Sequence, residues 1–64
     1  MNIEILKKEF SEMLAHEERA KHFYDHCIDQ LEEGDIKQKL ITIRDDEIKH
    51  IRIVDELIRC VSDE

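Results

Sequence analysis

Gly34 is the only glycine in a chain of 64 residues that contains no proline. Glycine and proline interrupt helices most strongly, so the sequence on either side of Gly34 is free of helix breakers. The stretch "LEEGDIKQ" around it is the only candidate turn. We therefore predict an all-α, antiparallel two-helix hairpin with helices over about residues 3–32 and 36–61, capped by Asn2 and Asp35.

Apolar residues recur at alternating spacings of three and four along both predicted helices. In the first helix this row, which we call the seam, consists of Ile3, Leu6, Phe10, Met13, Glu17, Ala20, Tyr24, Cys27 and Leu31. In the second helix it consists of Ile36, Leu40, Ile43, Glu47, His50, Val54, Leu57 and Val61. The spacing is typical of coiled coils and four-helix bundles. It directs three polar side chains, those of Glu17, Glu47 and His50, toward the interior.

The second helix carries another apolar row beside the seam, formed by Ile41, Ile48, Ile51 and Ile58. A single hairpin cannot cover two apolar rows, and a domain this small (residues 1–64) usually needs an additional constraint. A disulfide within one chain is excluded, because Cys27 and Cys60 would lie ~30 Å apart along the hairpin, far beyond the ~7 Å limit between their Cα atoms. We therefore predict a homo-oligomer, in which two hairpins form a four-helix bundle.

A turn at Gly34 places residues level with each other when their numbers sum to about 67. Glu17 then lies level with His50, and Ala20 lies level with Glu47. At ~1.5 Å per residue, the three polar groups fall within about one helical turn of each other. The small side chain of Ala20 leaves room beside Glu47, near the middle of both helices.

Burying one unpaired carboxylate costs several kcal/mol, and two adjacent carboxylates cost more. Protonation, a cationic neighbour such as Lys21 or Arg44, or a metal ion could each compensate. Metal ions fit by count, because a two-fold dimer supplies Glu17 and Glu47 twice, and these four carboxylates balance two divalent cations. Bundles that bind two iron or manganese ions use this set, a Glu from two helices and Glu-x-x-His from the others. Fe or Mn suits such ligands, and Zn is tolerated.

The chain has 17 acidic residues against 10 Lys and Arg, a formal charge of −7. This balance argues against binding to nucleic acid or to an anionic membrane and favours cations as ligands. No apolar run approaches the ~20 residues that a membrane span requires, and "MNIEILKKEF" is too charged for a secretory signal. A cytoplasmic location is therefore expected.

The segments "EERAKHFYD" and "RDDEIKH", whose glutamates at 17 and 47 lie thirty residues apart, resemble the encapsulated ferritins, half-ferritins of the ferritin-like superfamily. The resemblance covers about Glu17 to Val61. It implies a ferritin-like four-helix bundle with ferroxidase activity, in which Glu17, Glu47 and His50 bind a di-iron centre across a subunit interface. It also implies that Glu47 bridges the ions and that Tyr24 hydrogen-bonds a ligand. Dimers would form a ring that delivers Fe(III) to a mineral store inside an encapsulin shell.

Two other functions fit the same residues. One is a non-catalytic, acidic helical-hairpin module that serves only oligomerisation. The other is a redox-silent Mn or Zn site that clamps a dimer. Outside the seam, Glu18, His22 and His26 lie one helical turn apart and could either bind Zn or Ni weakly or form an ordinary solvated surface.

Overall fold

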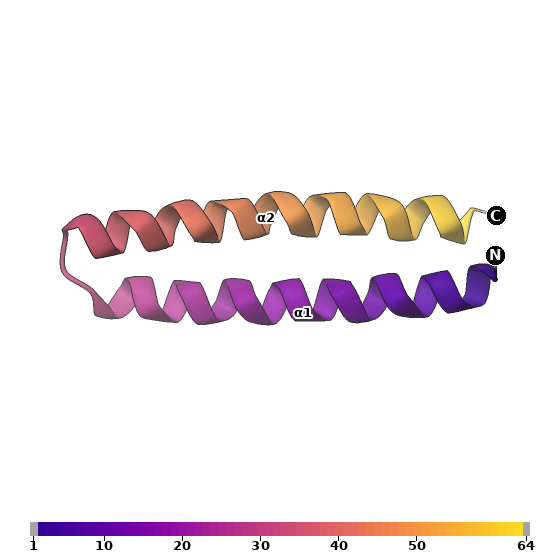
Figure 1. Ribbon diagram of the computed structural model, residues 1–64, viewed down its shortest axis with the longest axis horizontal. Coiled ribbons are helices and arrows are strands. Elements are labelled where there is room, and N and C mark those ends of the chain that lie inside the picture. The colour runs from indigo at the N-terminus through magenta and orange to yellow at the C-terminus, as the bar shows by residue number, and fades with distance from the viewer. Residues whose placement is uncertain (1, 64) are drawn as a thin grey trace.

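The computed structural model describes residues 2–63, which form two antiparallel helices joined by a short connection (Figure 1). Helix α1 covers Ile3–Gln30 and α2 covers Asp35–Ser62, 28 residues each. The hairpin measures 47 × 14 × 14 Å, and the two chain ends lie together at one end of it. The prediction of an all-α hairpin is confirmed. Neither helix has an apolar stretch long enough to cross a membrane.

Asn2 caps α1 as predicted. Its side-chain oxygen accepts hydrogen bonds from the backbone N–H groups of Glu4, at 2.9 Å, and Ile5, at 3.4 Å. Asparagine is among the preferred residues at this position because its short side chain satisfies donors that have no partner within the helix.

Helix α1 ends at Gln30, two residues before the predicted end, and Leu31 is already extended (φ −101°, ψ 144°). Continuing the helix would place the charges of Glu32 and Glu33 in its last turn, where the helix dipole disfavours anions. Glu33 instead lies just before α2, where its carboxylate binds the Lys37 ammonium at 3.0 Å. The acidic pair therefore ends one helix and supports the start of the next.

Gly34, and not Asp35, is the N-terminal cap of α2. Its backbone (φ 159°, ψ −177°) lies in a region that is essentially restricted to glycine. Asp35 becomes the first residue of the helix, where a negative charge interacts favourably with the helix dipole. Helix α2 consequently begins one residue before the predicted start at 36.

The hairpin has almost no core of its own. Within residues 2–63 only Ile28 and Val54 are buried, with 8% and 5% of their surface exposed. The accessible surface is 5033 Å², whereas a compact monomer of this mass would expose about 4300 Å². The single hairpin therefore leaves apolar surface exposed that a compact monomer of the same mass would bury.

Only part of the seam lies along the line where α1 and α2 meet. Its residues Met13, Ile36, Ile43 and Leu57 are 39–68% exposed, while Ile51 and Ile58 of the second predicted row are half-buried. The contact between the two helices is narrower than the seam, because a helix with one neighbour has less of its surface covered than a helix in a four-helix bundle. Part of the seam thus forms an open side, here named the front face. Its heptad-spaced positions are Leu6, Met13, Ala20, Cys27, Ile36, Ile43, His50 and Leu57.

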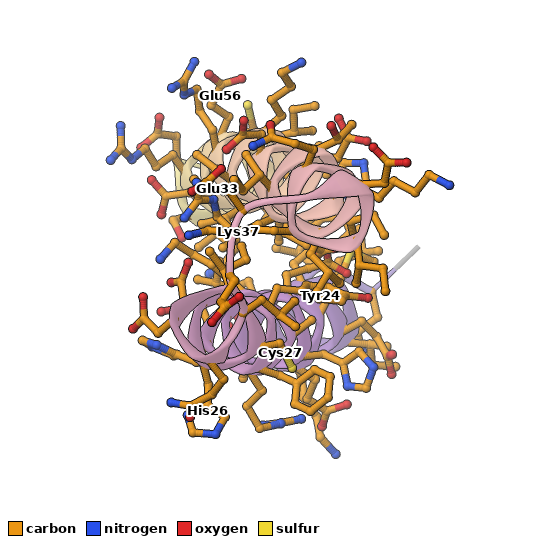
Figure 2. The ribbon with its side chains drawn as sticks, turned by 90° about the vertical axis from the view of Figure 1, so that its left-hand side faces the viewer. Tyr24, His26, Cys27, Glu33, Lys37 and Glu56 are labelled. Atoms are coloured by element: carbon orange, nitrogen blue, oxygen red, sulfur yellow. The ribbon has the colours of Figure 1, made fainter. Side chains whose placement is uncertain are left out.

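The opposite side, the back face, is more polar. It contains a groove of about 310 Å³ lined by Glu18, Lys21, His22, Ile48 and Ile51. Figure 2, viewed along the hairpin, shows Tyr24 and Lys37 on opposite sides of the helix pair. The two faces differ in charge, because none of the eight heptad-spaced front-face positions named above carries Asp, Glu, Lys or Arg.

The turn can be tested at Gly34. A Cβ at this position would meet nothing within 4 Å, so only backbone strain opposes a side chain. We expect Gly34→Ala to lower the free energy of unfolding by about 1–3 kcal/mol, measured by urea titration. D-alanine, introduced by chemical synthesis, is the matched control, because its mirror-image preference accommodates this backbone. Equal destabilisation by both enantiomers would contradict the strain explanation.

Candidate metal centre

The middle of the hairpin brings together the three polar seam residues. His50 Nδ1 of α2 lies 3.3 Å from Glu17 Oε2 of α1, as the predicted register requires. Glu47 precedes His50 by one helical turn, so both side chains reach the same level. One ligand atom from each of the three residues lies within 4.8 Å of the others. In the part of the chain that the structure describes, no other group of three His, Cys, Asp or Glu residues is as close.

Burial distinguishes the two carboxylates from the imidazole. The Oε2 atoms of Glu17 and Glu47 are both buried and have no hydrogen-bond partner among the described residues. The approach of His50 Nδ1 to Glu17 is an ion-pair distance without hydrogen-bond alignment. His50 itself is 57% exposed, because it lies on the front face. The prediction that all three point inward therefore applies to the carboxylates but not to the imidazole in a single hairpin.

Glu17 perturbs the neighbouring carboxyl group of Glu47. The close approach of the Glu17 carboxyl group raises the pKa of Glu47, first because sharing a hydrogen bond with it would require a proton on one of the two groups. Desolvation by burial and the charge of Glu17 raise it further, and His50 acts in the opposite direction. The ionised pair is thus disfavoured unless a cation or a proton compensates.

The nearby cationic side chains do not supply that compensation. Lys21 Nζ binds Asp25 Oδ2 at 2.7 Å, and Arg44 Nη1 binds Asp25 Oδ1 at 2.9 Å. The Arg44 Nε atom donates to Asp45 at 3.0 Å. These contacts lower the pKa of Asp25, chiefly through the hydrogen bond from Lys21, and raise that of Arg44, chiefly through Asp25. Of the three ways in which the buried charge could be compensated, pairing of Glu17 or Glu47 with Lys21 or Arg44 is therefore not observed among the described residues.

The centre opens into an apolar groove on the front face. The groove has a volume of about 260 Å³ and is lined by Met13, Glu17, His50, Ile53, Val54 and Leu57. Carboxylate oxygens and an imidazole nitrogen are ligands that suit Fe, Mn and Zn. The residues fit such an ion, because each carboxylate presents a buried oxygen that lacks a donor. Three ligands from one hairpin leave further coordination positions free.

Tyr24 is half-buried, with its ring edge-on to that of Phe23 at a centroid distance of 5.9 Å. It follows Glu17 by seven residues, or ~10 Å along α1. That separation is too long for Tyr24 to hydrogen-bond directly with Glu17, Glu47 or His50 of the same chain. A role for Tyr24 beside a metal ligand stays a prediction.

Other candidate residues lie outside the centre. Cys27 and Cys60 are both free. Glu18, His22 and His26 are not gathered into a close cluster, and Figure 2 shows His26 on the side of α1 away from α2. The sequence reasoning missed Asp25, although its spacing of four residues from Lys21 was a usable signal.

The chain matches no protein-family model, no curated protein and no solved structure. A helical hairpin serves many functions, so the fold alone assigns none. Functional inference for this chain rests on the geometry of the Glu17, Glu47 and His50 side chains.

The raised pKa of Glu47 predicts how the metal-free protein responds to pH. When the pKa of a carboxyl group is higher in the folded than in the unfolded state, the protonated group favours folding. This stability is lost as the pH rises from the unfolded pKa to the folded pKa. Stability should therefore fall as pH rises above the ordinary glutamate range. Glu47→Gln should remove this slope and raise the free energy of unfolding at pH 7 by about 1–3 kcal/mol, the cost of a buried unpaired group.

The measurement is urea unfolding in the presence of a chelator at several pH values. Glu56→Gln, an exposed change on the same helix, is the control and should alter stability by less than about 0.5 kcal/mol. A stability that is the same for wild type and Glu47→Gln at every pH would contradict the like-charge repulsion.

Proposed function

We propose that the protein is a ferroxidase, which oxidises Fe(II) with dioxygen at a two-metal site between two hairpins. One observation carries the proposal: two buried carboxylate oxygens without a donor lie beside an imidazole, next to an apolar groove. Buried charge of this kind is costly in a chain with so little core, and divalent cations compensate it most fully.

A second copy of the chain supplies the rest of the ligand set. Each helix has its midpoint near the centre, between residues 16 and 17 in α1 and between 48 and 49 in α2. A two-fold axis across this level therefore overlaps the whole length of both hairpins and brings the two half-sites together. In an antiparallel arrangement, Ile43 and Leu57, seven residues to either side of His50, pack against Leu57 and Ile43 of the partner subunit.

The dimer gives four carboxylates and two imidazoles at one level. Four negative charges offset two Fe(II) ions, and oxygen ligands stabilise Fe(III) relative to Fe(II), which favours oxidation. Iron is the substrate: two Fe(II) ions lose one electron each, and dioxygen gains both electrons and two protons. The products are two Fe(III) ions and hydrogen peroxide. The net charge of −7 draws cations toward the protein.

The wider biological role follows the resemblance to encapsulated ferritins. In that setting the dimers form a ring and deliver Fe(III) to a mineral store inside an encapsulin shell, which serves iron storage and detoxification. The ferroxidase site does not depend on this assembly, because it needs only two copies of the chain.

Iron oxidation is the direct test of activity. Fe(II) is added in air, and near-ultraviolet absorbance gives the initial rate. We expect the rate to exceed that of buffer and to fall roughly 100-fold or more in Glu47→Gln and His50→Ala, which remove a ligand. Glu56→Gln is again the control.

Two outcomes would contradict the ferroxidase proposal. A wild-type rate equal to that of buffer excludes the activity. If the protein binds metal without oxidising iron, and Glu47→Gln changes only its assembly, the centre is a redox-silent clamp.

The front face can be tested with two equivalent isoleucines. Ile43, on the front face, and Ile48, on the back, lie on the same helix with 41% and 37% exposure. Because a buried charge costs several kcal/mol, Ile43→Glu should weaken dimerisation by about 100-fold or more, measured by analytical ultracentrifugation. Ile48→Glu should leave it nearly unchanged. The reverse pattern would place the interface on the back face.

A further inference from the structure

Both cationic side chains near the centre are spaced to bind its carboxylates. Lys21 follows Glu17 by four residues, and Arg44 precedes Glu47 by three. Side chains at these separations are neighbours on a helix, and a glutamate four residues before a lysine is the more favourable orientation. Yet within residues 2–63 neither cation forms an ion pair with Glu17 or Glu47.

Asp25 holds both cations instead. Each of its carboxylate oxygens binds one of them, Oδ2 the Lys21 ammonium at 2.7 Å and Oδ1 the Arg44 guanidinium at 2.9 Å. The Lys21–Asp25 pair has the less favourable order along the helix. The Arg44–Asp25 pair compensates by joining α2 to α1, and all three side chains are only 27–31% exposed. Half-buried, charge-assisted hydrogen bonds of this kind are the stronger ones.

We propose that Asp25 is a positioning residue of the metal centre, which holds Lys21 and Arg44 away from Glu17 and Glu47. This inference rests on the proposed metal centre. Without the Asp25 carboxylate, the Lys21 ammonium and the terminal nitrogens of Arg44, whose Nε still contacts Asp45, turn toward the centre and bind its carboxylates. A metal ion must then displace an ammonium and a guanidinium before it can bind.

The proposal predicts the effect of Asp25→Asn on cation affinity. Co(II) is the probe, and its visible absorption reports both binding and coordination. We expect Asp25→Asn to raise the dissociation constant at least tenfold. Asp46→Asn removes the same charge beside Glu47, from an exposed residue, and should change the constant less than twofold. That control distinguishes the loss of the residue that holds Lys21 and Arg44 from a general loss of negative electrostatic potential.

A rescue variant separates this role from a structural one. Adding Lys21→Met and Arg44→Met to Asp25→Asn removes the competing cations, so wild-type affinity should return. A triple variant that stays as weak as Asp25→Asn would overturn the proposal. Asp25→Ala, which has a higher helix propensity, serves as a second variant if Asp25→Asn loses helix content by circular dichroism.

A crystal structure of metal-free Asp25→Asn gives a readout that needs no metal binding. We expect the Lys21 ammonium or the Arg44 guanidinium within ion-pair distance of Glu17 or Glu47. If both cations stay away from the carboxylates, the proposal is overturned. If wild type binds no Co(II) while the cations do turn inward, the proposed metal centre fails but the holding action of Asp25 stands.

Discussion

The repulsion between Glu17 and Glu47 is the constraint on which the rest of the molecule depends. Both carboxylates present a buried oxygen without a donor, at mid-length of a hairpin in which only two described residues are buried. Two helices with so little core have no surplus stability with which to offset this cost. The nearby cations leave the charge of the pair uncompensated, because they bind Asp25 instead.

Much of the hairpin and of its centre followed from the sequence, because each depends on local rules. The lone glycine located the turn, and the turn fixed a register that placed Glu17 level with His50, now 3.3 Å apart. Asn2 has few alternatives to capping at the start of a helix. Helix periodicity does not depend on a partner subunit, so the shared level of the three candidate ligands was predictable from one chain.

The features that could not be predicted from the sequence are those in which one side chain has two alternative partners. Helix α1 ends at Gln30, and Glu33 forms an ion pair with Lys37 of α2 and does not extend α1. Periodicity could not say which half of the seam faces α1 and which faces solvent, since seam positions three or four residues apart differ by only about 40–60° around the helix. It also could not decide whether Lys21 binds Glu17 or Asp25, because both lie four residues away and only the approach of Arg44 from α2 favours Asp25.

Metal binding, dimerisation and folding should therefore be one coupled equilibrium. The like charges that oppose burial in one hairpin would be doubled when two front faces meet, so metal-free dimerisation works against its own apolar contacts. In the proposed dimer, cations at the centre would convert that opposition into attraction. Linkage then requires the reciprocal effect, in which dimerisation raises cation affinity by the factor with which cations strengthen the dimer. The apolar positions of the front face and the binding of Lys21 and Arg44 by Asp25 would make this coupling strong, because neither cation then neutralises the pair instead.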